Sequence, residues 1–242
     1  MKTTKIEWTD KTWNPITGCS KYSAGCVNCY AEIMSNRLKA MGIPKYKNAF
    51  SITMHLNCLD EPKKWKRSCN IFVCSMSDLF HENVPFDFID KVLHTISSCP
   101  QHRFQILTKR AARMAKYFST RKVPSNTWIG VTVENIQAKS RIEHLQSINA
   151  KIHFLSCEPL IEDLGLLNLD NIQWIIVGGE SGSSARRMKQ SWVENIKQQA
   201  DFNGIPFFFK QWGTWGPDGI KRSKNKNGKL FNGEVVQIMP FF

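Results

Sequence analysis

Three cysteines lie within eleven residues near the start of the sequence, at positions 19, 26 and 29. Their spacing is C-x6-C-x2-C, and Gly18 and Gly25 directly precede Cys19 and Cys26. Glycines let the backbone pass close to a compact inorganic core. The remaining five cysteines are scattered along the chain, which is typical of small apolar core residues. The grouped residues Cys19, Cys26 and Cys29 are therefore the ones that could carry metal or redox chemistry.

Three interpretations of this cysteine loop stay open. A structural zinc ion takes four ligands, commonly as two close pairs, whereas here there is one pair, one offset cysteine and no histidine closer than His55. Three buried cysteines without a metal are the second interpretation, although a loop with two glycines places them poorly for a core. The third is a [4Fe–4S] cluster held by three thiolates, which leaves one iron free for a small molecule. In radical S-adenosylmethionine (SAM) enzymes that molecule is SAM, which the reduced cluster cleaves to a 5′-deoxyadenosyl radical.

The elements that must position this loop alternate regularly along the chain. Six short apolar runs, rich in β-branched or aromatic residues, begin at positions 71, 104, 128, 152, 174 and 206. Helical patterns lie between or after them at 86–98, 109–118, 136–147 and 191–202. Continuous apolar strands that alternate with helices indicate a parallel sheet buried on both faces. We therefore predict an α/β fold, a full or partial (β/α) barrel of parallel strands. An earlier unit is predicted as an extended segment at 5–13, helices at 31–41 and 61–67, and a strand at 51–56.

Polar or charged groups follow every one of the six predicted strands, at the end where parallel α/β folds and barrels build their sites. Carboxylates there suit the ammonium and ribose hydroxyls of SAM, serines suit its methionyl part, and glycines let the backbone approach it. The candidate cofactor-binding residues are Tyr30, Ser75, Ser77, Asp78, Glu134, Glu158, Gly178, Gly179 and Glu180. Two alternative interpretations remain. Ser77 or Asp78 could cap a helix, and Gly178–Glu180 could form a tight turn.

Three further strand-end residues are candidates for chemistry. A thiol at Cys74 or Cys157 could return a hydrogen atom to a substrate radical, and burial as a small apolar residue is the alternative for both. Lys109 could meet the SAM carboxylate or a substrate phosphate. The candidate substrate-binding residues offer cations for phosphate and planar groups for a base. They are Arg186, Arg187, Lys210, Gln211 and Trp212. For Trp212, a position in the core is the alternative.

The charge of the chain is strongly positive and unevenly spread. The formal net charge is +13, and no Asp or Glu occurs from Lys91 to Val133, where eight basic residues lie. Within the predicted helix, Lys109, Arg113 and Lys116 are spaced to share one face. Together with Arg110, these residues favour a polyanionic partner, DNA or RNA, whose phosphates they would neutralise. A second basic run at 221–229 fits either a solvated surface or the same partner.

Composition and length bound the remaining possibilities. With 242 residues, 42% hydrophobic and 22% charged, the chain is typical of a globular protein rather than a disordered, collagen-like or coiled-coil one. No apolar stretch approaches the roughly 18 residues that span a bilayer, and the N-terminus has no signal-peptide core, so we expect a cytoplasmic protein. We predict a barrel domain at 1–213 that includes the cysteine loop. Residues 214–242 then form a basic loop and a β-hairpin, because an Asn-Gly turn lies between two short runs.

Seven motifs give the sequence a resemblance to a known family. They are WNPITGC (13–19), GCVNCYA (25–31), SMSDLF (75–80), LTKR (107–110), EPL (158–160), GGESG (178–182) and FFKQWG (208–213). Together they resemble the phage-associated family of three-cysteine, radical-SAM-like proteins, over Trp8 to about Pro240. The resemblance implies a [4Fe–4S] cluster on Cys19, Cys26 and Cys29 and a SAM site in the barrel. The first cysteine gap is six residues, where the commonest radical-SAM spacing has three.

The function expected from these patterns is radical SAM chemistry on a nucleic acid, either base modification or repair of a lesion. Such chemistry needs an electron donor that reduces the cluster. Two alternatives remain. One keeps the radical chemistry but acts on a peptide or a partner protein, and a partner protein could also complete the site. The other is a zinc-stabilised, non-enzymatic module that binds nucleic acid.

Overall fold

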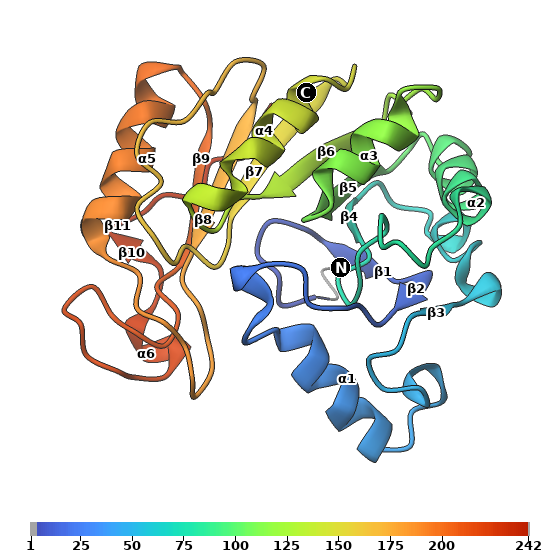
Figure 1. Cartoon of the computed structure of the whole chain (residues 1–242), viewed down its shortest axis with the longest axis horizontal. Helices are drawn as coiled ribbons and strands as arrows, with labels where there is room; N and C mark the ends of the chain where they lie inside the picture. The colour runs from blue at the N-terminus through green and yellow to red at the C-terminus, as the bar shows by residue number, and fades with distance from the viewer. Residues whose placement is uncertain (1–3, 242) are drawn as a thin grey trace.

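Seven runs of the chain form one all-parallel sheet in a computed structural model that describes residues 4–241. The strands are neighbours in chain order, so each crossover adds the next strand to the same edge. They are β1 (Lys11–Trp13), β4 (Asn70–Val73), β5 (Arg103–Thr108), β6 (Thr127–Thr132), β7 (Ile152–Cys157), β8 (Trp174–Gly178) and β9 (Phe207–Gln211). The sheet curls into a half-barrel (Figure 1). The predicted partial (β/α) barrel is confirmed.

Helices cover the outer face of this sheet. The four that follow strands are α2 (Phe86–Ser97), α3 (Ala111–Phe118), α4 (Ser140–Gln146) and α5 (Gln190–Phe202). Their apolar positions recur at helical spacing and pack against strand residues in one large core. In α2, for example, Ile89, Val92 and Ile96 are completely buried there. Because both faces of the central strands are covered, the strands are mostly apolar, as the continuous runs indicated.

The concave face of the half-barrel holds a second, aromatic core. Trp8 lies against it, with its ring centroid 4.7 Å from that of Phe72 and 6.1 Å from that of Trp174. Phe154 and Phe208 complete this floor beside Trp174. Side chains alternate between the two faces along a strand. Thr132, Ser156 and Lys210 therefore share the concave face with the aromatic residues of their strands and lie nearer the carboxyl ends. This polar end of the concave face is the mouth of the half-barrel.

The N-terminal unit carries the cysteine loop. Its elements are β2 (Ile16–Thr17), which pairs antiparallel with β3 (Thr53–Met54), the helix α1 (Tyr30–Ala40), and four short 3-10 turns at 24–26, 44–46, 56–58 and 62–64. Gly18 has φ +83°, and a Cβ there would lie 2.2 Å from the backbone oxygen of Ser51. The chain can enter the loop in this way only with glycine at position 18.

A hairpin closes the β9 edge of the sheet. The strands β10 (Leu230–Phe231) and β11 (Glu234–Val235) pair antiparallel around Asn232 and Gly233, both of which have positive φ. The chain then runs beside β9, where Phe209 N–H donates to Val236 O at 2.7 Å. The predicted Asn-Gly hairpin over one edge is therefore confirmed. Before it lies the short helix α6 (Lys224–Asn227).

Some predicted elements differ from the structure. Helix α3 begins at Ala111, so Lys109 lies before it and does not share a helical face with Arg113 and Lys116. The predicted helix at 61–67 is only the 3-10 turn Pro62–Lys64, since four like charges at 63, 64, 66 and 67 repel along so short a helix. The segment 136–147 begins with a 3-10 turn at 136–139. Within residues 4–241, no helix has the length and apolar character to cross a membrane.

Candidate functional site

The cysteine loop lies across the mouth of the half-barrel, beside the end of β4. Gly18 N–H donates to Met76 O at 3.1 Å, and Cys19 N–H donates to Phe50 O at 3.0 Å. All three loop cysteines are free and partly exposed. In the part of the chain that the structure describes, no group of three or more His, Cys, Asp or Glu side chains lies close enough together to hold a single metal ion. The cluster ligands Cys19, Cys26 and Cys29 therefore stay a prediction.

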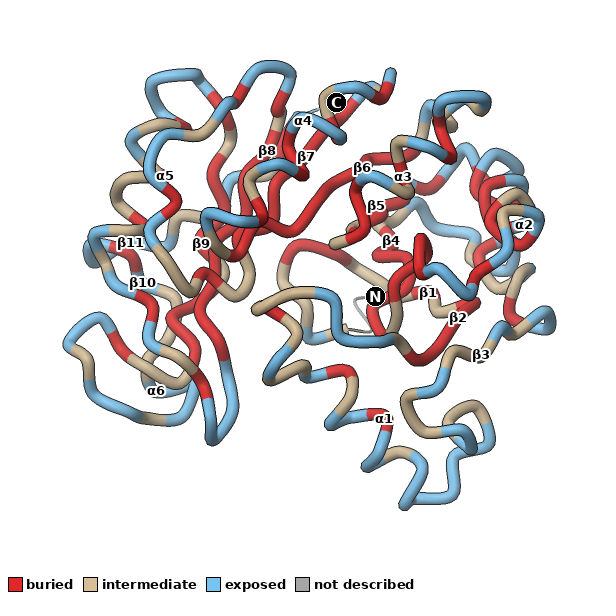
Figure 2. The backbone as a smooth tube through the Cα atoms, viewed as in Figure 1, coloured by how far each residue is buried: buried red, intermediate tan, exposed pale blue. Residues whose placement is uncertain are grey.

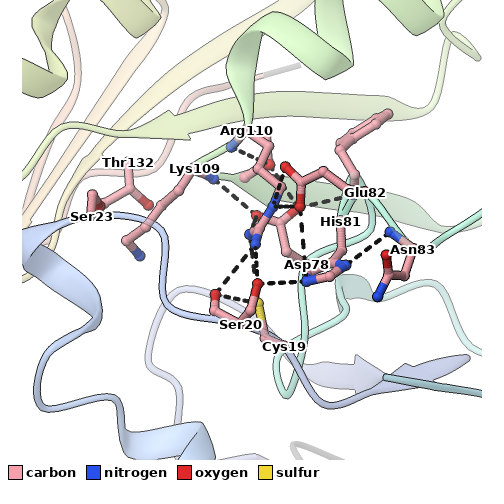
Figure 3. Close-up of polar contacts among 12 residues, drawn as sticks. Cys19, Ser20, Ser23, Asp78, His81, Glu82, Asn83, Lys109, Arg110 and Thr132 are labelled. Atoms are coloured by element: carbon pink, nitrogen blue, oxygen red, sulfur yellow. Dashed lines mark hydrogen bonds and ion pairs between the residues drawn. The ribbon is translucent and has the colours of Figure 1, made fainter. Parts of the chain in front are cut away.

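The first attachment of the loop is the ion pair of Asp78 and Arg110 (Figure 3). The Arg110 guanidinium is 3% exposed and also binds Glu82, with Nε 2.8 Å from Oε2. It donates to the Cys19 thiol at 3.6 Å and to Ser20 Oγ at 3.0 Å. Burial and the Asp78 carboxylate raise the pKa of Cys19 to about 11, while Arg110 acts in the opposite direction.

A histidine supports the same end of the loop. The Nδ1 atom of His81 accepts from Asn83 N–H at 3.1 Å, so in the neutral ring the proton resides on Nε2. That Nε2 lies 2.7 Å from Ser20 Oγ and donates to it. Burial, with Arg110 nearby, lowers the pKa of His81 and favours this neutral form.

The second attachment is Glu134, which follows β6 and is completely buried. Its carboxylate pairs with Arg141 at 2.7 Å and accepts from Gly25 N–H at 3.2 Å and from the Ser23 hydroxyl. Burial by itself would raise the pKa of Glu134, but Arg141, Ser23 and Lys109 outweigh it and the pKa is lowered. A Cβ at Gly25 would lie 3.1 Å from the Glu134 side chain, so any larger residue there would push this carboxylate away.

The third attachment is Glu180, which follows β8. It accepts from Asn28 Nδ2 at 3.0 Å and pairs with Arg186 at 2.6 Å. Arg186 also donates to Ala24 O at 2.9 Å. Three strand-end carboxylates thus hold the loop, each together with an arginine. Sequence reasoning grouped these carboxylates but missed Arg141, since no local motif marks it.

The accessible part of the mouth contains one further ion pair. Glu158 follows β7 and lies 2.9 Å from Lys210 of β9, with side-chain exposures of 14% and 22%. Ser156 Oγ donates to the Glu158 carboxylate at 3.3 Å. A Cβ at Gly178 would lie 2.6 Å from Glu158 Oε1, so the glycine leaves room for this carboxylate. Unlike the three attachments, this pair makes no hydrogen bond or ion pair with the loop within the described part of the chain.

The other serines and the tyrosine of the predicted cofactor set lie at the β4 end. Ser75 Oγ donates to Asn14 Oδ1 at 3.2 Å, and Ser77 Oγ donates to Ile16 O at 2.9 Å. The Tyr30 hydroxyl donates to Ser75 O. These hydroxyls therefore tie the start of α1 and the β2 strand to the end of β4.

The two candidate thiols lie within the core. Cys74 and Cys157 are 3% and 0% exposed and belong to the cluster between the sheet and its helices. Burial raises the pKa of both thiols, to about 12 for Cys74. Cys157 alternates with Ser156, so its side chain points to the helix side rather than to the mouth. These positions fit the alternative interpretation as small core residues.

The C-terminal candidates divide between core and surface. Trp212 is 2% exposed and donates from its indole to Leu230 O at 2.8 Å, which makes it a core aromatic. Gln211 donates to Gly179 O at 2.9 Å, and a Cβ at Gly179 would clash with Trp212 O at 1.9 Å. Gly179 therefore serves the close approach of two chain segments. The Arg187 guanidinium packs against Gly219.

The predicted basic surface after β5 is only partly available to a polyanionic partner. Arg110 is buried between Asp78 and Glu82, and Arg113 donates to Val84 O at 2.7 Å beside the Phe86 ring. Lys116 remains exposed. The side chain of Lys109 runs toward Ser23 (Figure 3). Two cations of this stretch, Arg110 and Arg121, therefore pair with carboxylates of the fold.

Comparisons with known proteins give one family match. A family model described as "Protein of unknown function (DUF5131)" matches residues 3–240. No curated protein matches the chain.

Three solved structures of spore photoproduct lyase resemble the fold, each at 13% identity. The complex with dinucleoside spore photoproduct has a TM-score of 0.41 and covers 77% of this chain and 59% of its own. A cysteine-to-serine mutant has a TM-score of 0.44, with 83% and 65% covered. A double mutant with bound AdoMet and dinucleoside spore photoproduct has a TM-score of 0.40, with 78% and 60% covered. The chain thus spans less than two thirds of these structures.

Proposed function

The chain belongs to the DUF5131 family, and we propose that it is a radical SAM enzyme that modifies or repairs a base of a nucleic acid. In this proposal Cys19, Cys26 and Cys29 hold a [4Fe–4S] cluster. The observation that carries it is the attachment of the cysteine loop to three strand ends at the mouth of a parallel half-barrel. A loop fixed at three points keeps its thiols at the mouth without a metal to organise it.

The donor set fits such a cluster in its chemistry. Thiolates are the ligands of iron–sulfur clusters, and three of them leave one iron without a protein ligand. The thiols are partly exposed at the mouth, while the remaining cysteines lie elsewhere in the chain. A cluster held by Cys19, Cys26 and Cys29 would, once reduced by an external donor, supply the electron for reductive cleavage of SAM to methionine and a 5′-deoxyadenosyl radical, which would take a hydrogen atom from the substrate.

We propose fewer SAM-binding residues than the sequence alone predicted. The carboxylates of Asp78, Glu134 and Glu180 are each paired with an arginine. Glu134 and Glu180 accept directly from the loop, and Asp78 acts on it through Arg110, so we assign all three to holding the loop. The half-buried Glu158 carboxylate suits the SAM ammonium, and Lys210 suits its carboxylate.

The nucleic-acid part of the proposal rests on charge. The chain carries a formal net charge of +13. Phosphate neutralisation by such a surface supplies sequence-independent affinity for a polyanion. Exposed lysines that remain after the internal ion pairs, such as Lys116 at the end of α3, are available for it.

Anaerobic reconstitution tests the proposal. We expect about four irons and four sulfides per chain and 5′-deoxyadenosine when SAM and dithionite are added. Cys19→Ala, Cys26→Ala and Cys29→Ala should each lose the iron, whereas Cys69→Ala, outside the loop, should keep it. One zinc per chain, or iron binding that is unaffected by the loop variants, would refute the proposal.

A further inference from the structure

Helix α1 extends from the cysteine loop away from the sheet, and most of its surface is exposed (Figures 1 and 2). Its buried side is narrow, with Ala31 and Ser35 as the buried residues. We call residues 30–47, which comprise α1 and the turn that follows it, the α1 arm. The arm begins beside the mouth, because the Tyr30 hydroxyl donates to Ser75 O at the end of β4.

The exposed side of the arm carries an apolar stripe. Tyr30, Met34 and Met41 are 58%, 41% and 62% exposed, and Arg37 lies between them. The steps of 4, 3 and 4 residues place all four on one side of a helix. Ile33, 63% exposed, borders the stripe. Apolar residues at helical spacing normally face a core, but this stripe lies beside the buried residues Ala31 and Ser35 and is itself exposed.

Beyond Glu32, which pairs with Lys21, the charge of the arm has one sign. No Asp or Glu occurs from position 33 to 59, and the basic residues there are Arg37, Lys39, Lys45 and Lys47. Within residues 4–241, the side chains of Arg37, Lys39 and Lys47 have no ion pair or hydrogen bond. This differs from the stretch after β5, where Arg110 and Arg113 are engaged inside the fold. Unneutralised cations on an exposed arm fit a polyanionic partner.

We propose that the α1 arm binds single-stranded nucleic acid and leads it to the mouth. Arg37 and Lys47 would contact phosphates, and the stripe would contact base faces. Duplex stacking hides those faces, so an apolar stripe distinguishes an unpaired strand. Tyrosine rings stack on bases, and methionine thioethers make favourable contacts with aromatic rings. The inference deepens the proposed function and takes its nucleic-acid substrate as a premise, by stating that the base is reached in an unpaired strand.

Fluorescence anisotropy with the cluster-loaded full chain tests this inference. The probes are labelled oligothymidylate, oligouridylate and a duplex of mixed sequence, which also distinguish DNA from RNA. Wild type should bind one of the single strands more tightly than the duplex. Combining Met34→Ser with Met41→Ser should weaken single-strand binding by about tenfold or more. Combining Arg37→Gln with Lys47→Gln should lower the slope of log K against log salt by about 0.7 for each phosphate that the variant no longer neutralises.

Matched controls are available elsewhere on the surface. Leu166 and Phe202 are 82% and 91% exposed, so Leu166→Ser with Phe202→Ser removes exposed apolar surface outside the arm, from residues that are more exposed than Met34 and Met41. Lys122→Gln removes an exposed charge before β6, at the opposite end of the strands from the mouth. Both controls should bind like wild type. Circular dichroism melting of every variant separates weaker binding by a folded chain from unfolding.

Two outcomes would overturn the inference. One is single-strand affinity of the arm variants equal to that of the controls. The other is a wild-type dimer that dissociates in the Met34→Ser, Met41→Ser variant, which would assign the stripe to a second copy of the chain. Formation of 5′-deoxyadenosine without nucleic acid is measured in parallel. If no 5′-deoxyadenosine forms but the arm variants weaken single-strand binding, only the proposed radical chemistry is wrong. If 5′-deoxyadenosine forms but the arm variants bind single strands like wild type, only the assignment of the arm is wrong.

Discussion

The backbone N–H of Gly25 donates to the carboxylate of Glu134, 109 residues further along the chain, at 3.2 Å. This hydrogen bond joins the middle of the cysteine loop to the end of β6. The same carboxylate is completely buried and pairs with Arg141, which is 7% exposed. The loop is therefore held by a charge pair that belongs to the core of the protein.

Replacing that carboxylate should destabilise the fold and release the loop together. Glu134→Ala leaves the Arg141 guanidinium buried without a partner, which costs about 3–5 kcal/mol. Urea denaturation measures this decrease, and the iron content after reconstitution should fall in the same variant. Glu143→Gln, on the exposed side of α4, is the control and should change neither value. An unchanged unfolding free energy would show that the pair contributes nothing.

Two glycines with similar φ angles should respond very differently to alanine. Gly18 and Gly233 have φ +83° and +85°, but a Cβ meets Ser51 O at 2.2 Å only at Gly18, while nothing lies within 4 Å at Gly233. Gly233→Ala should cost about 1 kcal/mol, the conformational cost by itself. Gly18→Ala should cost more than this and displace the loop. Urea denaturation compares them, and equal decreases in unfolding free energy would contradict the steric argument.

The stability of the protein should fall as pH decreases from 7 to 5, in part because of His81. Burial lowers the pKa of His81 in the folded state below its ordinary value of 6.5. Below that value the unfolded chain binds a proton that the folded chain does not, so the free energy of unfolding decreases as pH falls. The contribution is at most about 1.4 kcal/mol per pH unit.

Urea denaturation at several pH values measures this dependence. His81→Gln should flatten the curve between pH 7 and 5, whereas His144→Gln, on the exposed side of α4, should leave it unchanged. The lowered pKa of Glu134 acts in a separate window, below the ordinary value of 4.5. A curve with the same slope in His81→Gln and wild type would contradict the assignment.

The sequence predicts the strands of this protein well because each is a continuous apolar run, and it predicts the hairpin because Asn232-Gly233 requires positive φ at both positions. The predicted start of α3 is wrong for a long-range reason. Asp78 accepts from Lys109 N–H at 3.1 Å and so holds that residue outside the helix. The loop partners of Glu134 and Glu180 escape local patterns for the same reason, since these hydrogen bonds span more than 100 residues.

The accessible pair Glu158–Lys210 should decide SAM binding without affecting the loop. Its two side chains lie 2.9 Å apart and are partly exposed at the mouth. Glu158→Gln keeps the shape of the side chain but removes the charge that would attract an ammonium group. Charged hydrogen bonds contribute about 1.5–3 kcal/mol, so the SAM dissociation constant should rise by about tenfold to a hundredfold. Equilibrium dialysis of SAM against the cluster-loaded chain measures it.

Iron content should remain that of wild type in Glu158→Gln, because the loop is attached through other residues. Lys210→Met should weaken SAM binding in the same way if Lys210 meets the SAM carboxylate. Gly178→Ala should have a similar effect by a different route, since its Cβ would lie 2.6 Å from Glu158 Oε1 and displace that carboxylate. Unchanged SAM affinity in all three variants would place the SAM site away from this pair, even if the cluster is present.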